Sequence, residues 1–461
     1  FSNDSTLSFS VSDTTAGSFT VRAVNASNSN VTGESGLVTV SAAAADHLVR
    51  LTAEDPITVG NDRLLQFKLE DVYGNEISNA TVTFTRVRGN GTFSNGLSNI
   101  SATTDGNGIA EALYTASTDL SYGSDSIDVV SGSVSSTYVM TLQAASVSYY
   151  TFVPSTDQNI TAGGSVNFTI TARDQYGNGV VNSGTVSIST PGSSTATVSP
   201  SSSLSFSNDS TLSFSVSDNT AGSFTVRAVN SSNSNIKGES GLVTVSPAAL
   251  SYVLIRTEAN NGGSEVGDLN ITTDDAVTMY AAGYDQYDNY ISDTDVTWSS
   301  TGTLESVSAT GSKYTFSPTQ AGGSGQIVAT PSGSVTADQT GTITVSTGAL
   351  AELRLQTADW DGGQTLGDTS ITADETLTLY AVGYDADDNY IGLTSANWSL
   401  NGLSGTLSPG NPTTSVTFTP DQKGSGSLQA TASSNSQVSD RTGSITVTAG
   451  TVSYVLIRDE A

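Results

Sequence analysis

Hydrophobic residues alternate with polar ones along most of this chain. Leu7, Phe9 and Val11 alternate with Ser and Thr, and Phe19 and Val21 continue the pattern after a turn. A period of two, interrupted by Gly, Asn, Asp and Ser, is typical of β-strands joined by turns. The sequence shows no sustained helical periodicity. The pattern therefore predicts an all-β protein.

The pattern also repeats along the chain. Residues 1–44 return at 206–249 with changes at five of the 44 positions, and residues 251–298 return in diverged form at 351–398. Self-similarity at a fixed spacing indicates an array of domains, here of about one hundred residues each. We expect four complete domains, preceded by the C-terminal half of one and followed by the first strand of another. The expected segments are 1–45, 46–143, 144–247, 248–347, 348–448 and 449–461.

Short linkers join the expected domains. A last strand runs almost directly into the next first strand through three or four small residues, for example at 144–146 and 247–249. Linkers this short allow limited bending between neighbouring domains. We therefore expect an elongated, semi-rigid rod.

A turn recurs at one place in every complete domain. It reads Asp-x-Tyr-Gly-Asn, or a close variant, at 71–75, 174–178, 285–289 and 385–389. The Gly or Asp before the Asn stands where tight turns commonly need positive φ, and the first Asp is suited to cap the backbone. The next strand carries a large apolar residue, which we expect to anchor the core of an immunoglobulin-like sandwich: Phe84, Ile188, Trp298 and Trp398.

These motifs carry a family resemblance. Together with Thr-Asp-Gly-Asn-Gly-Ile-Ala at 104–110 and Ala-Gly-Ser-Phe-Thr-Val-Arg-Ala at 221–228, the turns resemble bacterial immunoglobulin-like (Big) repeats. The resemblance covers all four complete domains. It implies a tandem array of immunoglobulin-like β-sandwiches at the cell surface, because such repeats form the stalks of invasin- and intimin-type adhesins. It says little about any ligand.

The chain is strongly acidic, with a formal net charge of −29. Such acidity repels nucleic acid and anionic membranes, so we expect neither as a partner. No apolar run approaches the roughly 20 residues of a membrane-spanning helix. Phe1 lies within a repeat and no signal peptide precedes it, so we expect this chain to be part of a longer one.

Catalytic chemistry has few candidate residues. The chain has no Cys, and His47 is its only His. A metal site of nitrogen or sulfur ligands is therefore not expected. No nucleophile elbow, phosphate-binding loop or dinucleotide fingerprint lies between a strand and a helix. We expect neither an enzyme nor an organic cofactor.

Calcium is the strongest chemical candidate. Residues 257–275 and 357–375 are long acidic loops with Gly-Gly and Gly-Asp at matching positions. Calcium prefers six to eight oxygen ligands, which such loops can supply. The alternative is that these aspartates only cap backbone groups at strand ends. The candidate ligands are Asp268, Asp274, Asp285, Asp368, Asp374 and Asp385.

Two features of the sequence relate to sugars: sequons for glycosylation and tyrosines able to stack on a sugar ring. Twelve Asn-x-Ser/Thr sequons make the chain a candidate glycoprotein, although polar loops also produce such triplets; they include Asn3, Asn25, Asn79, Asn90, Asn159, Asn208, Asn270 and Asn397. Four tyrosines, which we expect at the surface, are candidates to stack on a bound sugar; the alternative is that they pack over turns or between domains. They are Tyr150, Tyr287, Tyr290 and Tyr390.

The combined expectation is a structural, extracellular or cell-surface repeat protein that forms a semi-rigid stalk, fibre or sheath. Its expected partners are neighbouring copies or further repeats, and surface glycans or a partner cell. The alternative is a carbohydrate-binding adhesin module assisted by calcium. That alternative predicts a groove of exposed aromatic residues beside the acidic loops 257–275 and 357–375.

Overall fold

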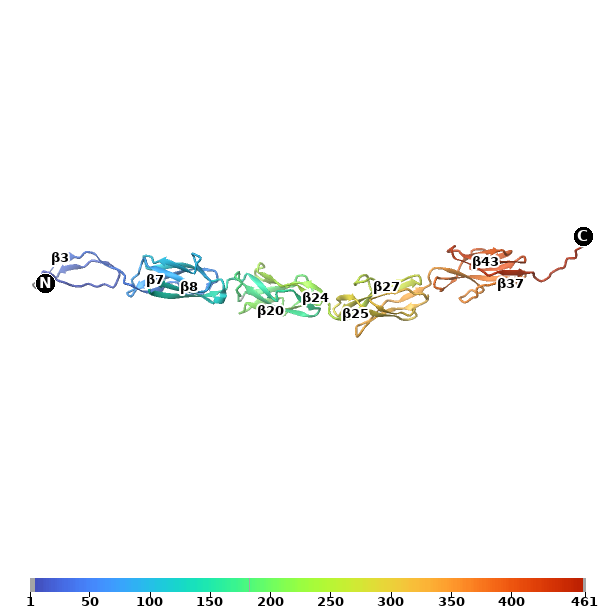
Figure 1. Ribbon diagram of the computed structural model, residues 1–461, viewed down its shortest axis with the longest axis horizontal. Helices are drawn as coiled ribbons and strands as arrows, with labels where there is room; N and C mark the ends of the chain where they lie inside the picture. Colours follow the sequence, from blue (N-terminus) through green and yellow to red (C-terminus); the bar gives the residue numbers. More distant parts are fainter. Residues whose placement is uncertain (1–4, 182, 459–461) are drawn as a thin grey trace. The chain divides into compact units, whose positions relative to one another are not determined.

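The computed structural model describes residues 5–181 and 183–458, which form an all-β chain (Figure 1). The helical content of these residues is one 3-10 turn, η1 (Leu120–Tyr122). The prediction of an all-β array of immunoglobulin-like sandwiches is confirmed. The chain separates into two compact units, residues 1–246 and 247–461.

The first unit begins with two small sheets. β1 (Gly17–Phe19) pairs with β4 (Val38–Val40), and β2 (Arg22–Asn25) pairs with β3 (Asn28–Glu34). Residues 7–11, expected as a strand, lie in no strand, although their identical copy at 212–216 lies in β20 (Thr211–Ser217). Strand structure requires a neighbour for the backbone N–H and C=O groups. β20 has β16 and β18 as neighbours, whereas no described strand pairs with residues 7–11.

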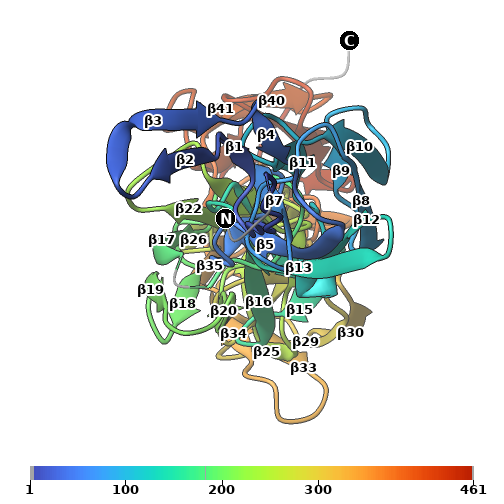
Figure 2. The same ribbon diagram turned by 90° about the vertical axis from the view of Figure 1, so that its left-hand side faces the viewer.

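Two sheets form the first complete domain. One has the order β5-β7-β11-β9 and the other β10-β8-β12-β13-β6, with β8 and β12 side by side in Figure 2. The strands are β5 (Ala45–Arg50), β6 (Ile57–Thr58), β7 (Asp62–Asp71), β8 (Thr81–Arg88), β9 (Thr92–Phe93), β10 (Asn99–Thr103), β11 (Ile109–Thr115), β12 (Ser124–Ser131) and β13 (Val134–Gln143).

The second complete domain has three sheets, of orders β14-β16-β20-β18, β15-β24-β21 and β19-β17-β22-β23. Besides β20, its strands are β14 (Tyr149–Val153), β15 (Gln158–Thr161), β16 (Ser165–Arg173), β17 (Gly184–Ser189), β18 (Thr197–Ser199), β19 (Ser203–Phe206), β21 (Gly222–Phe224), β22 (Arg227–Asn230), β23 (Lys237–Glu239) and β24 (Val243–Ser246).

The second unit contains two further domains. The strands of its first domain are β25 (Leu250–Arg256), β26 (Leu269–Thr272), β27 (Val277–Asp285), β28 (Tyr290–Asp293), β29 (Val296–Ser300), β30 (Ser308–Gly311), β31 (Lys313–Phe316), β32 (Ser324–Gly325), β33 (Ile327–Pro331), β34 (Asp338–Gln339) and β35 (Ile343–Ser346). Those of its second domain are β36 (Glu352–Gln356), β37 (Thr369–Thr372), β38 (Leu377–Tyr384), β39 (Tyr390–Leu393), β40 (Ala396–Asn401), β41 (Gly405–Ser408), β42 (Ser415–Pro420), β43 (Gly424–Ala432), β44 (Ser439–Arg441) and β45 (Ile445–Thr448).

One parallel pairing recurs in all four complete domains. The last strand pairs in parallel with a short early strand, as β13 with β6, β24 with β15, β35 with β26 and β45 with β37. The other pairs of named strands are antiparallel. Because the last strand pairs with an early strand of the same domain, each domain is closed by its own last strand. Residues 449–458 lie in no strand, and residues 451–458 are exposed. A first strand of a further domain at 449–461 therefore stays a prediction; residues 459–461, like the sequon Asn3, lie outside the described residues.

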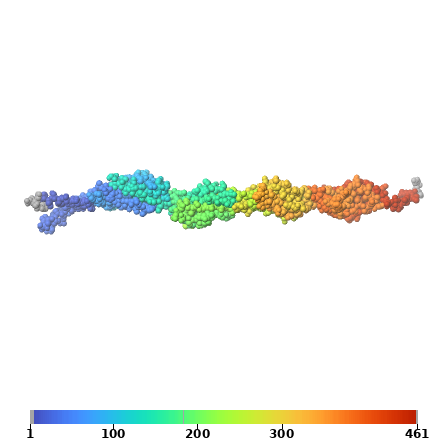
Figure 3. Space-filling view, turned by 90° about the horizontal axis from the view of Figure 1, so that it is seen from below, coloured from blue at the N-terminus to red at the C-terminus, as the bar shows by residue number. Residues whose placement is uncertain are grey.

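The space between the sheets is filled by the inward-facing side chains of the alternating pattern. Figure 3 shows the outer surface of the chain, coloured by residue number. All four predicted anchors are buried: Phe84, Ile188, Trp298 and Trp398. The two tryptophans also satisfy their indole N–H groups, which donate to main-chain oxygens at 2.9 and 3.0 Å. Tyr150, expected at the surface, is instead buried and stacks on Phe206.

Candidate functional site

The recurrent Asp-x-Tyr-Gly-Asn turn lies where the linker enters each complete domain. It follows β7, β16, β27 and β38, and its first Asp is buried in each case. The residue before the Asn has positive φ in all four turns, as the sequence predicts: Gly74 at 82°, Gly177 at 90°, Asp288 at 66° and Asp388 at 71°. This backbone conformation directs the Asn side chain back toward the Asp.

The Asp carboxylate organises the turn from within. In the first complete domain, Asp71 Oδ1 accepts hydrogen bonds from the backbone N–H groups of Tyr73 and Asn75, both at 2.9 Å. Asn75 Nδ2 donates to Asp71 Oδ2 at 2.8 Å. The other three turns make the same bonds. The turn is therefore held by hydrogen bonds within its own domain.

The second carboxylate oxygen holds the linker that enters the domain. Asp71 Oδ2 accepts from the backbone N–H of Ala43 at 2.8 Å. The corresponding linker donors to the other three aspartates are Ala145 at 3.1 Å, Ala248 at 2.7 Å and Gly348 at 2.9 Å. Each linker is thus fixed to the domain that follows it.

The Asn side chain extends the contact to the preceding domain. Asn178 Nδ2 donates to the carbonyl oxygen of Thr118, and Asn178 Oδ1 accepts from the N–H of Leu120, both at 2.9 Å. The same two bonds join Asn75 to Thr14 and Ala16, at 2.9 and 2.6 Å. They also join Asn389 to Thr319 and Ala321, both at 3.0 Å. We call this two-bond contact the Asn bridge.

Hydrogen bonding also sets the charge state of the aspartates. Burial raises the pKa of Asp71, but hydrogen bonds from the Asn75 side chain and from backbone N–H groups lower it more strongly, to about 2. The same balance lowers the pKa of Asp174, Asp285 and Asp385. The four carboxylates are therefore ionised at neutral pH.

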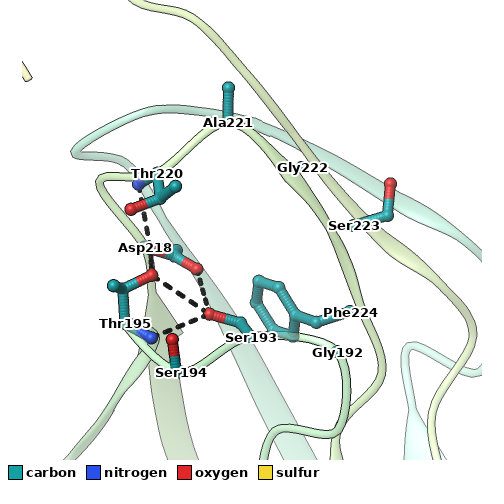
Figure 4. Close-up of a pocket in the computed structure, with 10 residues that line it drawn as sticks. All are labelled: Gly192, Ser193, Ser194, Thr195, Asp218, Thr220, Ala221, Gly222, Ser223 and Phe224. Atoms are coloured by element: carbon teal, nitrogen blue, oxygen red, sulfur yellow. Dashed lines mark hydrogen bonds between the residues drawn. The ribbon is translucent and has the colours of Figure 1, made fainter. Parts of the chain in front are cut away.

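A carboxylate also holds the loop that the Asn bridge contacts. Asp13 caps this loop in residues 1–45, and Asp218 caps its copy in the second complete domain. Asp218 accepts from the N–H of Thr220 at 2.9 Å and from the hydroxyls of Ser193 and Thr195 at 2.5 and 2.8 Å (Figure 4). A hollow of about 140 Å³ beside it is lined by the same loop. Hydrogen bonds to an Asp carboxylate therefore hold this loop in both copies of the repeat.

The junction in the second unit is the most extensively bonded. Its linker residues Gly348 and Ala349 donate to Asp385 and Asp274, respectively, at 2.9 and 2.7 Å. The Thr273 hydroxyl also donates to Asp385, at 2.7 Å. Two of the six predicted calcium ligands are thus brought to one linker, from opposite sides of the junction.

The other predicted ligands lie apart from one another. Asp268 and Asp368 accept from the N–H groups of Thr342 and Ser444, both at 2.7 Å. Asp374 accepts from Thr451, and Asp285 lies in its own turn. Within residues 5–181 and 183–458, the structure has no group of three or more His, Asp or Glu side chains arranged to hold a metal ion. A calcium site at these aspartates stays a prediction.

His47 is partly exposed beside Asp46 and Glu70. The bonds of the Asn bridge were not predicted, although the same Asn ends all four turns and was the available signal. The described residues contain no helix that is both long enough and apolar enough to span a membrane.

No protein-family model and no curated protein matches this chain. Among solved structures, it is similar to invasin, a bacterial integrin-binding protein, at 15% identity over 87% of this chain and 78% of the invasin chain, with a TM-score of 0.35. The Escherichia coli adhesin FdeC matches at 16% identity over 67% of this chain and 100% of its own, with a TM-score of 0.34. InvD of Yersinia pseudotuberculosis matches at 17% identity over 75% and 95%, with a TM-score of 0.32. These adhesins are of the kind that the sequence motifs resemble, and values this low leave the role of this chain to be inferred from its own residues.

Proposed function

We propose that this chain is a structural repeat protein of the cell surface or extracellular space, whose domains are linked end to end into a semi-rigid stalk or fibre. The observation that carries the proposal is the Asn bridge, which has the same two-bond geometry at three junctions. A bond pattern repeated at successive junctions suits a spacer better than a binding site for one ligand.

The Asn bridge resists bending because it works together with the linker. The Asp fixes the linker to the following domain, and the Asn attaches that domain to a loop of the preceding one. A domain that rotates about the linker must break both bonds of the bridge. Each hydrogen bond contributes about 0.5–1.5 kcal/mol, so the two bonds favour one relative orientation by about 1–3 kcal/mol.

The chemistry of the chain supports a surface location. Its motifs resemble bacterial immunoglobulin-like repeats, and its net charge of −29 favours solubility and discourages binding to nucleic acid. The proposed partners are further repeats along the chain. Surface glycans or another cell are the proposed partners at the far end of the stalk.

Spin labels on either side of one junction test the proposal. The chain has no Cys, so Ser135→Cys on β13 and Asn167→Cys on β16 introduce two labelling sites at exposed strand positions without competing thiols. We expect the full chain to give a narrow interspin distance distribution by pulsed electron paramagnetic resonance. Asn178→Ala removes the bridge, so the distribution broadens.

Asn107→Ala is the matched control. Asn107 also lies in an Asp-containing turn, but its backbone N–H and side-chain amide donate to Asp105 within the same domain. We expect this variant to keep the narrow distribution. A broad distribution in the unmodified chain, or equal widths with and without Asn178, would contradict the stalk proposal.

A further inference from the structure

The last complete domain carries an open hollow of about 500 Å³, within the size range of small-molecule sites. It lies between the end of β36, the acidic loop that follows, and the end of β38. It is separate from the domain junction described above. Its lining residues are Arg354, Gln356, Asp361, Gly362, Gly363, Gln364, Thr365 and Tyr384.

A buried acceptor without a partner faces this hollow. Gln356 is 2% exposed, and its Nε2 donates to the Tyr384 hydroxyl at 3.0 Å. The Tyr384 hydroxyl in turn donates its single proton to Asp361 Oδ1 at 3.1 Å. That direction fixes the orientation of the Gln356 amide, because the hydroxyl can only accept from Nε2. Gln356 Oε1 is left without a hydrogen-bond partner among the described residues, and such a buried oxygen favours an incoming donor.

A glycine packs directly against this oxygen. A Cβ atom at Gly363 would lie 2.6 Å from Gln356 Oε1, closer than real contacts allow. Glycine at position 363 therefore leaves room for the oxygen in the wall of the hollow, where both residues lie. Burial raises the pKa of Tyr384, so its hydroxyl keeps the proton that holds the arrangement in place.

The rim of the hollow carries an exposed aromatic ring. Trp360 is 60% exposed, whereas the other two tryptophans of the chain lie in domain cores. Its ring lies against Gly362, where an added Cβ would be 2.8 Å from the ring. An exposed ring beside polar groups is a stacking platform for an amphipathic ligand.

The charge at the hollow argues against an anionic ligand. The guanidinium of Arg354 lies over the Tyr384 ring, 4.0 Å from its centroid. It forms ion pairs with Glu352 and Asp388, so its positive charge is already compensated. Asp361 adds a further carboxylate. The groups that remain suit a neutral ligand rich in hydroxyl donors.

The matching loop of the preceding domain has different residues at two of these positions. Arg256 occupies the position of Gln356, and its guanidinium donates to the carbonyl oxygens of Gly262 and Gly263 at 3.4 and 3.0 Å. Asn260 stands where the other domain has Trp360. We call this loop, which Arg256 bonds to its own backbone, the closed loop.

We infer that this hollow binds a neutral carbohydrate, with a sugar hydroxyl donating to Gln356 Oε1, another to Asp361, and the sugar ring stacked on Trp360. The inference does not depend on the stalk proposal, since it concerns one domain and no junction residue. It adds a recognition site on the side of the array.

The test uses the full chain and a panel of immobilised neutral oligosaccharides ending in galactose, glucose, mannose or N-acetylglucosamine. We expect at least one to bind and to change the fluorescence of Trp360 in solution. Trp360→Asn and Gln356→Arg introduce the residues of the preceding domain, and each should weaken binding about fivefold, since stacking and hydrogen bonding are each worth about 1 kcal/mol. Gly363→Ala should block the oxygen and weaken binding likewise.

Asn260→Ala in the closed loop is the matched control and should leave binding unchanged. Thermal unfolding of each variant separates loss of the site from loss of the fold, and the variants that copy the preceding domain should keep the unfolding midpoint. Absence of binding to the whole panel would overturn the inference. So would binding that survives both Trp360→Asn and Gln356→Arg, or a preference for acidic glycans.

Discussion

At three junctions, a single Asn side chain contacts two main-chain atoms of the preceding domain. The turn that presents it needs positive φ at the preceding residue, which Gly supplies in two domains and Asp in the other two. Gly74 has no atom within 4 Å of an added Cβ, so backbone conformation rather than crowding favours glycine there. The buried Asp of the turn has a pKa that is lowered by the hydrogen bonds it accepts.

Asp71 provides a prediction about acid sensitivity. Its pKa in the folded state is about 2, below the ordinary value of about 3.9 in an unfolded chain. A lowered pKa contributes stability that is present above pH 4 and is lost as the pH falls through 4 toward 2. We expect carbon-detected nuclear magnetic resonance to place the Asp71 titration near pH 2, and urea unfolding of the 46–143 domain to weaken over this interval.

Asp71→Asn is the control for that measurement. The variant lacks the titrating group, so its stability should be lower at neutral pH and should depend less on pH between 4 and 2. A titration of Asp71 at its ordinary value would contradict the assigned hydrogen bonds.

At the scale of elements, one sequence adopts two structures in the same chain. Residues 5–13 and 210–218 are identical, yet of these two described segments only the second forms a strand, between β16 and β18. The apolar side chains follow the same rule: Phe9 is 66% exposed, and Phe214 at the matching position is 4% exposed. Alternation specifies which face of a strand is apolar, but pairing decides whether the strand forms.

Hydrogen exchange of the 461-residue chain measures this difference. We expect the backbone amides of residues 212–216 to be protected by pairing within the sheet, and those of residues 7–11 to exchange faster by at least about a thousandfold. The two copies can be assigned separately because Thr14 and Asn219 differ beside them. Equal protection of the two copies would show that residues 7–11 have a strand partner in solution.

The sequence predicted the fold class and the core anchors well, because alternation and bulky residues express burial within one domain. It predicted the turn conformation at Gly74 and Asp288 for the same local reason. It could not predict the Asn bridge, since the partners of Asn178 are main-chain atoms, which every sequence has. The sequence could not predict the hollow beside Trp360 either. Only the contacts of Arg256 reveal how the matching loop of the preceding domain differs.

At the scale of the whole molecule, acidity is concentrated in the two domains of the second unit. Residues 248–347 carry 11 acidic and 2 basic side chains, and residues 349–448 carry 11 and 3. Self-repulsion of such charge opposes compact structure and is reduced by salt or by bound cations. The six predicted calcium ligands lie in these domains.

Calcium should therefore raise the thermal unfolding midpoint of these domains by a few degrees if the six aspartates bind it, because a ligand of the folded state stabilises that state. The fluorescence of Trp298 and Trp398, both in the cores of these domains, follows the transition. Magnesium and sodium chloride at matched ionic strength control for screening. Equal midpoints in calcium and in the matched salts would contradict specific calcium sites and leave the aspartates as backbone caps.

The Asn bridge bonds to main-chain atoms of the preceding domain, and this affects how repeats can be exchanged during evolution. A junction that depended on paired side chains would fail whenever one repeat was exchanged for another with different residues. Across the junction, Asn178 bonds to a carbonyl oxygen and an N–H group, and its equivalents bond to the same two kinds of group at Thr14 and Ala16 and at Thr319 and Ala321. Recombination can therefore duplicate, delete or reorder repeats without spoiling their joints. The near-identity of 1–44 and 206–249 is the trace that one such duplication would leave.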